Sequence, residues 1–239
     1  MKLEKTLISR FIVDLFYPNR CPCCDCFINW KDNLCKSCMD KLEIINHEIC
    51  SRCGKAPCVC DGGISFDKVY ACYYYGGTAT EGIISLKKGN NLNYGIHVGE
   101  QLANLLQDNE DLHKVDFIVP VPMSKKKIKQ RGYNQAEIIA RIISEKTGIP
   151  YNSKILTREH TDIEQHSLSA EERKMNTSQY NINDVDLSNM RILLCDDVLT
   201  TGSTVNRCSE LLKARGADTV IILVGTTTKT QDLKCRREK

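Results

Sequence analysis

The sequence contains no long apolar run, and this excludes one large class of structures. No stretch approaches the roughly 20 consecutive apolar residues that a membrane-spanning helix needs. A signal peptide is not indicated either, because Glu4, Arg10 and Asp14 interrupt the apolar residues near the start and no small-residue cleavage site follows. We therefore expect no integral membrane segment.

The apolar residues near the start are instead spaced to form one face of an amphipathic helix over 1–20. They are Leu3, Leu7, Phe11 and Leu15. We expect this face to pack against the rest of the protein, and contact with a membrane surface is the alternative.

A strong charge imbalance is also absent. The 33 lysine and arginine residues against 30 acidic residues leave a formal charge of +3, which is too small to indicate a nucleic-acid partner by itself. The 239 residues are enough for one α/β domain of ordinary size and a small accessory module. The location of charge is therefore more informative than its sum.

Cysteine is abundant, and its distribution is uneven. Ten of the 14 cysteines fall between Cys21 and Cys60, mostly in CxxC pairs. Such pairs are typical of metal sites in a reducing compartment rather than of disulfides. This favours a cytoplasmic location, with the inner face of the membrane as a neighbouring alternative for a chain that starts with an amphipathic helix.

The cysteine pairs predict one or two structural zinc sites. Two CxxC pairs about ten residues apart supply four thiolates for a tetrahedral zinc ion. The first predicted site consists of Cys21, Cys24, Cys35 and Cys38. Cys23 and Cys26 have the same spacing and are an alternative to its first pair. The second predicted site consists of Cys50, Cys53, Cys58 and Cys60.

The segment 21–62 has few large apolar side chains, so bound metal would supply folding free energy that packing cannot. Four thiolates leave no open coordination position for a catalytic water, so we expect the zinc to be structural. Redox-active thiols are the second interpretation and disulfides the third. Asp61–Gly63 is typical of a hinge, after which we expect a second domain over 63–239.

Apolar runs and helical stripes alternate through this second domain, which predicts an α/β fold with a parallel sheet and helices on both faces. We expect strands over 67–75, 115–121, 154–157, 192–195 and 218–227, and helices over 80–88, 96–106, 138–148 and 205–216. The polar region 158–183 is either a lid over a site or a disordered loop, with a short helix capped by Ser169 and Glu172.

The strand at Ile192–Cys195 is followed by two acids and then by a small-residue loop at the start of a helix. Unpaired N–H groups and the helix dipole at such a loop favour a phosphate group. Carboxylates at the strand end suit sugar hydroxyls or phosphate-bound Mg²⁺. The predicted site consists of Asp196, Asp197, Thr200, Thr201, Gly202, Ser203 and Thr204. A simple helix cap with solvated acids is the alternative.

A basic run follows the strand at 115–121. Carboxyl ends of parallel strands are where α/β sheets bind ligands, so the loop from Val121 to Lys125 is a candidate to receive a pyrophosphate group. The candidate residues are Val121, Pro122, Met123, Ser124, Lys125, Arg131 and Lys87. Attraction of nucleic-acid phosphate by the lysines and a solvated surface are two other interpretations.

Several of these motifs occur together in one order, which resembles the ComF family of competence-associated proteins. The cysteine pairs are followed by Tyr75-Gly76, Leu86-Lys87, Pro120–Pro122, Arg131–Gln135, Gln165, Arg173, Asn176 and Asp196–Thr204. The resemblance implies an amino-terminal double zinc ribbon and a type I phosphoribosyltransferase domain. By it, Asp196 and Asp197 hold the ribose hydroxyls of phosphoribosyl pyrophosphate (PRPP), and Thr200 to Thr204 wrap its 5′-phosphate.

The resemblance also implies Mg²⁺ bound with PRPP, contact with single-stranded DNA and DNA-uptake proteins, and a role in natural transformation. Catalysis is less well supported. Some purine phosphoribosyltransferases of this fold have an acid where this chain has Thr200, and a neutral hydroxyl is a poor general base near pH 7. A pentosyl transferase of nucleobase or nucleotide metabolism and a non-catalytic zinc-ribbon scaffold are therefore alternatives.

Overall fold

A four-stranded parallel sheet forms the centre of the structure. The structure is a computed structural model, and it describes residues 18–45, 49–56, 58, 63–89, 91–109, 112, 114–159 and 179–229. The strand order is β1-β6-β5-β2, so the two last strands in the sequence lie in the middle. The strands are β1 (Lys68–Tyr74), β6 (Thr219–Thr227), β5 (Arg191–Leu199) and β2 (Phe117–Pro120).

The central strands are apolar on both faces because both faces are covered. Residues Ile192–Cys195 of β5 are fully buried, and residues Val220–Val224 of β6 are no more than 1% exposed. Leu193 in β5 pairs with Ile221 of β6 on one side and with Ile118 of β2 on the other. An unbroken apolar run is what a parallel strand in this position requires.

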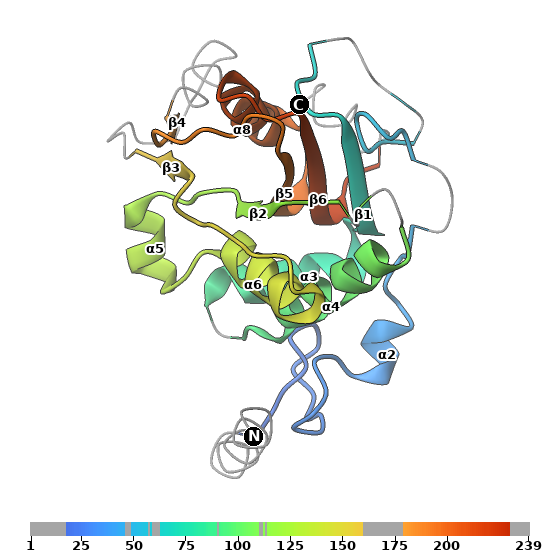
Figure 1. Ribbon diagram of the computed structural model, residues 1–239. Coiled ribbons are helices and arrows are strands. Elements are labelled where there is room, and N and C mark those ends of the chain that lie inside the picture. The colour runs from blue at the N-terminus through green and yellow to red at the C-terminus, as the bar shows by residue number, and fades with distance from the viewer. Residues whose placement is uncertain are drawn as a thin grey trace, which may run out of the picture.

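Helices cover both faces of the sheet, which confirms the predicted fold class. Figure 1 shows α3 (Gly77–Lys88), α4 (Asn93–Gln107) and α6 (Gln135–Thr147) on one face and α8 (Ser203–Ala214) on the other. Each face has its own apolar core, with Leu102 and Ile139 on the three-helix side and Val205 and Leu212 on the α8 side. None of the described helices is both long and apolar enough to cross a bilayer.

A short antiparallel pair lies beside α8 at one edge of the sheet. It consists of β3 (Leu156–Arg158) and β4 (Tyr180–Ile182), and Thr157 pairs with Asn181. Residues 160–178 join the two strands and lie outside the described residues. The lid and the helix cap predicted at Ser169 and Glu172 fall in that gap.

Two elements at the carboxyl ends of the strands differ from the expectation in ways that affect the site. The run that starts at Lys125 is not a loop: Lys125–Arg131 form helix α5, which Gly132 ends at φ 85°. Lysine and arginine are good helix formers, so the run needs no apolar stripe to be helical. Strand β5 also continues past the two acids to Leu199, because Asp196 keeps its place opposite Val224 of β6.

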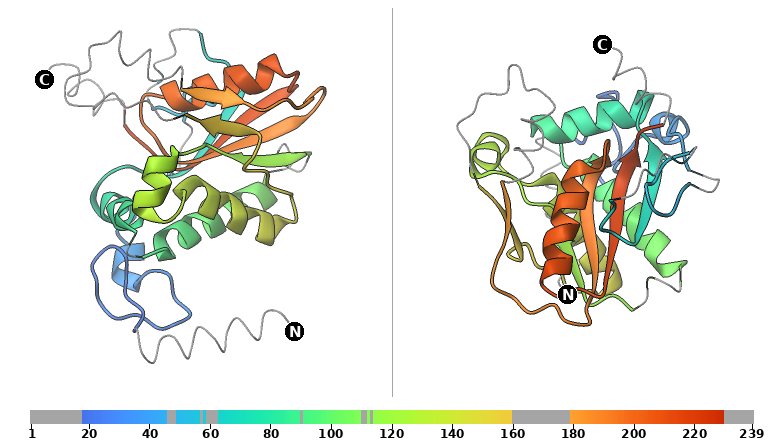
Figure 2. Two further views of the ribbon diagram at one scale, coloured as in Figure 1. Left: turned by 90° about the vertical axis from the view of Figure 1, so that its left-hand side faces the viewer. Right: turned by 90° about the horizontal axis from the view of Figure 1, so that it is seen from above.

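The cysteine-rich segment packs in two places. Residues 18–42, with α2 (Lys36–Met39), lie under the three-helix layer, on the side away from the sheet (Figure 2). Residues 43–45 and 49–56 lie beside β1: Tyr74 N donates to Glu43 O, and Val69 N donates to Ser51 O. The helix expected over 1–20 and the hinge at 61–63 lie almost entirely outside the described residues.

Candidate functional site

A cavity of about 210 Å³ opens at the carboxyl ends of β2 and β5, where a parallel sheet binds ligands. Eight of the residues expected to contact ligand line it: Lys87, Val121, Pro122, Met123, Arg131, Asp196, Asp197 and Thr204. The others do not: Ser124, Lys125, Thr200, Thr201, Gly202 and Ser203. The structure therefore brings the two acids and the expected pyrophosphate loop to one cavity.

The two acids differ in their contacts. Asp196 Oδ1 accepts a hydrogen bond from Asp197 N at 2.8 Å. Asp197 Oδ2 lies 3.0 Å from Lys87 Nζ in an ion pair, but it is buried and accepts no well-aligned hydrogen bond from the described residues. Burial and the neighbouring Asp197 charge raise the pKa of Asp196 well above its usual range. Lys87 offsets part of this repulsion, but two adjacent carboxylates remain electrostatically unfavourable at a buried position.

The loop after β5 has the geometry of a helix-terminal anion site. Gly202 has φ 83°, a conformation that glycine adopts without strain, and α8 begins at the next residue. Thr201 Oγ1 lies 3.0 Å from Ser203 Oγ. The first N–H groups of α8 have no partner within the helix, and they carry the positive end of its dipole. Thr204 extends this loop to the cavity wall.

The stretch Arg131–Gln135 joins the end of α3 to the end of β2. Tyr133 OH donates to Leu86 O at 2.5 Å, beside Lys87. Asn134 Nδ2 donates to Val121 O at 3.0 Å, while its Oδ1 caps α6 at Ala136 N. These contacts fix both sides of the cavity entrance relative to each other.

Positive charge dominates the cavity wall. Four cationic side chains face two carboxylates there: Lys87, Lys127, Arg131 and Arg158. Burial and the charges of Arg158, Arg131 and Lys87 lower the pKa of Lys127. Cations held this close repel each other, and an anionic ligand relieves that repulsion. The cavity is therefore suited to a ligand with several negative charges.

Six lining residues were not predicted as site residues: Lys127, Asn134, Gln135, Ala136, Arg158 and Tyr180. Lys127 belongs to the basic run that starts at Lys125, and Asn134 and Gln135 belong to the Arg131–Gln135 motif. The sequence therefore contained a signal for these three residues. Gln135 Nε2 is buried and has no hydrogen-bond partner in the described part of the chain, which leaves a donor for a ligand. Arg158 stacks over the Tyr180 ring at 4.8 Å, and no local pattern indicates that pairing.

A larger groove of about 690 Å³ lies between the first cysteine segment and α3. Its charged lining residues are mixed in sign: Arg20, Lys88, Asp25 and Glu81. This groove lacks both the excess of cations and the paired carboxylates of the smaller cavity. We therefore take the smaller cavity as the candidate ligand site.

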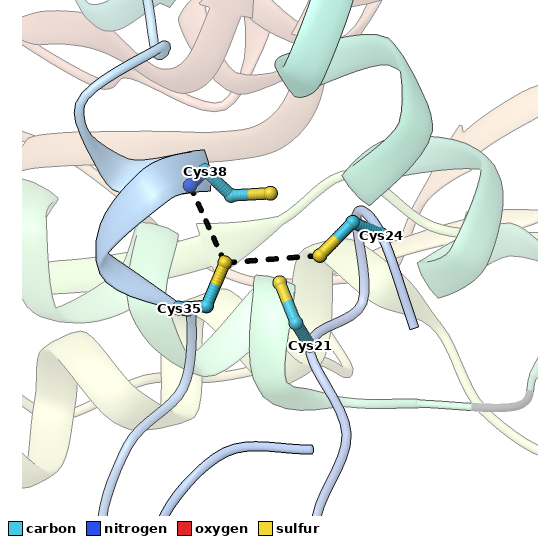
Figure 3. A group of neighbouring side chains, drawn as sticks. All are labelled: Cys21, Cys24, Cys35 and Cys38. Carbon is cyan, nitrogen blue, oxygen red and sulfur yellow. Dashed lines mark hydrogen bonds between the residues drawn. The ribbon is translucent and has the colours of Figure 1, made fainter. Parts of the chain in front are cut away.

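Four cysteine side chains converge on one point in the first cysteine segment (Figure 3). The sulfur atoms of Cys21, Cys24, Cys35 and Cys38 all lie within 4.8 Å of one another. Cys24 Sγ is 3.7 Å from Cys35 Sγ. Four thiolates around a tetrahedral zinc ion at about 2.3 Å lie about 3.8 Å apart, so the arrangement fits zinc.

The alternative first pair is only partly excluded by this geometry. Cys23 is not in the converging group, whereas Cys26 Sγ lies 3.4 Å from Cys24 Sγ at its edge. In the second segment, the sulfurs of Cys50, Cys53 and Cys58 also lie within 4.8 Å of one another. The expected fourth ligand, Cys60, lies outside the described residues.

The phosphoribosyl transferase domain model matches residues 90–234, and the double zinc ribbon domain model matches residues 12–73. The chain belongs to the phosphoribosyl transferase domain family. The family match covers every strand of the sheet except β1 and includes the acids and loop of the cavity. The domain limits expected at 21–62 and 63–239 differ from these matched ranges and stay predictions.

Three curated relatives of this chain have names that refer to DNA utilization or to competence. DNA utilization protein YhgH of Salmonella typhi is 34% identical over 105 residues, which are 44% of this chain and 46% of that protein. Competence protein F of Haemophilus influenzae is 32% identical over 133 residues, 52% of this chain and 58% of that protein. The chain thus spans about half the length of these two relatives.

Competence protein ComFC of Bacillus subtilis is 24% identical over 199 residues, which are 77% of this chain and 80% of that protein. Among solved structures, a purine phosphoribosyltransferase from Pyrococcus horikoshii matches 55% of this chain and 80% of that chain, with 18% identity and a TM-score of 0.35.

Asp196→Asn is expected to stabilise the protein at neutral pH. The pKa of Asp196 is higher in the folded protein than its unfolded value of about 3.9. Its contribution to folding stability is therefore fully present below about pH 3.9 and is lost as the pH rises through the folded-state pKa. The amide keeps the acceptor for Asp197 N without the charge. We expect the melting temperature to rise by about 2–4 °C at pH 8 and by less at pH 5.

Asp186→Asn is the matched control for that measurement. The Ser188 hydroxyl and N–H lower the pKa of Asp186, so removing this charge should lower the melting temperature at pH 8. Equal melting temperatures for wild type and Asp196→Asn at both pH values would contradict the assigned repulsion.

Proposed function

We propose that this protein binds PRPP together with Mg²⁺ in the cavity at the ends of β2 and β5. The observation that carries the proposal is the meeting of two carboxylates, four cationic side chains and the Gly202 loop at one end of the sheet. PRPP has a 5′-phosphate, two ring hydroxyls and a pyrophosphate, which need an anion loop, acceptors and cations. No simpler anion uses all three.

Each part of the cavity has a role in this proposal. The N–H groups and hydroxyls at Thr200–Thr204 hold the 5′-phosphate, and Asp196 and Asp197 accept from the ribose hydroxyls. Lys87 and Arg131 face the pyrophosphate from the side of α3 and α5. Gln135 Nε2 has no hydrogen-bond partner among the described residues, and Asp197 Oδ2 has only its ion pair with Lys87 there; both gain hydrogen bonds from the ligand.

Mg²⁺ fits the same residues, because Mg²⁺ binds through one or two carboxylates together with substrate phosphates. Bound there, it would neutralise charge on the pyrophosphate. Ser124 and Lys125 do not line the cavity and are not needed in this arrangement.

Phosphoribosyl transfer is the second candidate function. The family match favours it, but Thr200 supplies no carboxylate to take the proton of an incoming base. Asp196, with its raised pKa, is a cavity group with acid–base capacity, yet it is needed for the ribose. We therefore propose PRPP binding as the primary activity, with PRPP acting as a ligand that controls another function.

That other function is the handling of incoming single-stranded DNA, together with DNA-uptake proteins, in the cytoplasm near the inner face of the membrane. The names of the relatives support it. The first cysteine segment supports it independently: Phe27 is 65% exposed with the Arg20 guanidinium 4.1 Å above its ring, and Lys31 lies 4.9 Å from the Trp30 ring. Aromatic side chains beside cations are what unpaired bases stack on.

The cysteine clusters are proposed as two structural zinc sites. The first consists of Cys21, Cys24, Cys35 and Cys38, and the second of Cys50, Cys53 and Cys58, completed by Cys60. All-thiolate coordination leaves no position for substrate, so the zinc would stabilise the segment that carries the aromatic surface.

Asp197→Ala is expected to weaken PRPP binding at least 10-fold, because it removes the acceptor for a ribose hydroxyl and the partner of Lys87. Calorimetric titration of PRPP with Mg²⁺ measures this. Asp184→Ala is the control, because it removes an exposed carboxylate that does not line the cavity. Absence of binding by folded wild type would refute the proposal. Base-dependent pyrophosphate release that disappears in Asp197→Ala would establish the transferase instead.

Cys21→Ser is expected to remove one equivalent of zinc from the purified protein, since three thiolates hold the ion poorly. Cys23→Ser should keep the full zinc content, because Cys23 is not in the converging group. Elemental analysis of both variants measures this. Zinc loss in Cys23→Ser with retention in Cys21→Ser would favour the alternative first pair.

Phe27→Ala is expected to weaken binding of an oligo-dT strand by about 1–3 kcal/mol, which is the range for loss of one stacked base. Ile44→Ala, which truncates another exposed apolar side chain, should bind as wild type does. Fluorescence anisotropy of a labelled oligonucleotide gives both affinities. Equal affinity of the two variants would exclude stacking on Phe27.

A further inference from the structure

One lysine joins the second cysteine segment to the sheet. Lys55 is only 3% exposed, and its Nζ lies within hydrogen-bond distance of four oxygen atoms at the ends of β5 and β6, which between them accept from its three N–H groups. These are Leu199 O at 3.0 Å, Thr227 Oγ1 at 2.9 Å, Thr228 O at 3.1 Å and Thr228 Oγ1 at 2.7 Å. Lys55 lies two positions after Cys53, within the three-cysteine group.

The acceptor at Leu199 is where the phosphate loop leaves the sheet. Leu199 is the last residue of β5 and directly precedes Thr200. Its carbonyl also accepts from Thr228 N at 3.2 Å and from Thr227 Oγ1 at 3.4 Å. The direction of the chain as it enters the loop is therefore fixed by donors from β6, from the residue after it and from Lys55.

The cysteine segment sets the position of Lys55. Gly54 N donates to Cys50 O at 2.8 Å, and Cys50 N donates to Lys55 O at 3.0 Å, which closes a tight turn. Gly54 has φ 68°, and a Cβ there would lie 2.8 Å from side-chain atoms of both Leu199 and Val69. The turn therefore fits against the strand ends only with glycine at this point.

Packing alone does not require a lysine here. A buried ammonium group is costly unless oxygen atoms satisfy it, and an apolar side chain would fill the same space more cheaply. What the ammonium adds is a set of directed bonds to strand-end oxygens. Those bonds fix the strand ends where the loop begins, and they lie outside the middle of the apolar core.

We propose that Lys55 is a positioning residue for the phosphate loop, and that the group formed by Cys50, Cys53 and Cys58 holds it in place. The proposal rests on the proposed PRPP function for its ligand. It adds that the second cysteine group, although it does not line the cavity, determines how tightly the loop binds the 5′-phosphate. Zinc held by this group would thereby be linked to PRPP affinity.

The test compares Lys55→Met with Leu102→Ala. The methionine keeps an apolar stem without the ammonium. Leu102→Ala removes a fully buried side chain from the three-helix layer, away from the loop. Two quantities are measured: PRPP affinity by calorimetry, and amide hydrogen exchange of residues 200–204 in the ligand-free protein. We expect Lys55→Met to bind PRPP at least 10-fold more weakly and to exchange faster in the loop, whereas Leu102→Ala changes neither.

Two further variants keep the test decisive. Thr228→Val removes one acceptor of the Lys55 ammonium and leaves the Lys55 charge in place. It therefore tests the positioning role if Lys55→Met does not fold. We expect a smaller loss of PRPP affinity, about 3-fold. Cys53→Ser, with its zinc content measured, should reproduce the effect of Lys55→Met. Unchanged affinity in Cys53→Ser despite zinc loss would overturn the proposed link.

Failure of this proposal differs from failure of the proposed function. If wild type does not bind PRPP, the function is wrong, and loop exchange alone still decides the role of Lys55. If wild type binds PRPP while Lys55→Met and Thr228→Val bind equally well with unchanged loop exchange, the positioning role is wrong and the function stands.

Discussion

The pairing of β5 with β6 is the interaction on which the rest of the structure depends. These strands are buried on both faces, and their register continues from Arg191 opposite Thr219 to Leu199 opposite Thr227. Because β5 stays paired beyond its apolar part, Asp196 and Asp197 are held on a rigid strand rather than in a loop. The same pairing delivers Leu199 to the Gly202 loop at a fixed point. A site built on a strand end in this way is preorganised for its ligand.

The candidate site keeps its charges at a cost to stability. Asp196 has a raised pKa and Lys127 a lowered one, so both signs of charge are crowded in the free protein. Only one ion pair between the cavity carboxylates and cations, Lys87 with Asp197, is formed in the described part of the chain. A ligand with phosphates and hydroxyls separates these charges by contacting each of them. Such local strain is typical of functional sites rather than of the apolar core around them.

Much of this arrangement follows from the sequence, because local patterns determine it. The buried strand before Asp196, the glycine loop and the spacing of Cys21, Cys24, Cys35 and Cys38 each depend on neighbouring residues. The helical state of Lys125–Arg131 was missed because a short helix without an apolar stripe has no periodic signal. The continuation of β5 past its acids was missed because cross-strand pairing outweighs the local preference of aspartate.

Other features depend on contacts between distant parts of the chain, which one sequence does not reveal. Arg158 stacks on Tyr180 across a gap in the described residues. Lys55 bonds to Thr228, 173 positions later. The sequence pattern places the cysteine groups and the phosphate loop in separate domains, whereas the structure brings the second group against the strand ends that carry the loop.

The most direct test of this account is a crystal structure of the zinc-loaded protein grown with PRPP and Mg²⁺. The account predicts the 5′-phosphate on the N–H groups at 200–204, the ribose hydroxyls at Asp196 and Asp197, and the pyrophosphate beside Lys87 and Arg131. A ligand bound elsewhere, or a fully formed cavity that stays empty at saturating PRPP, would contradict it.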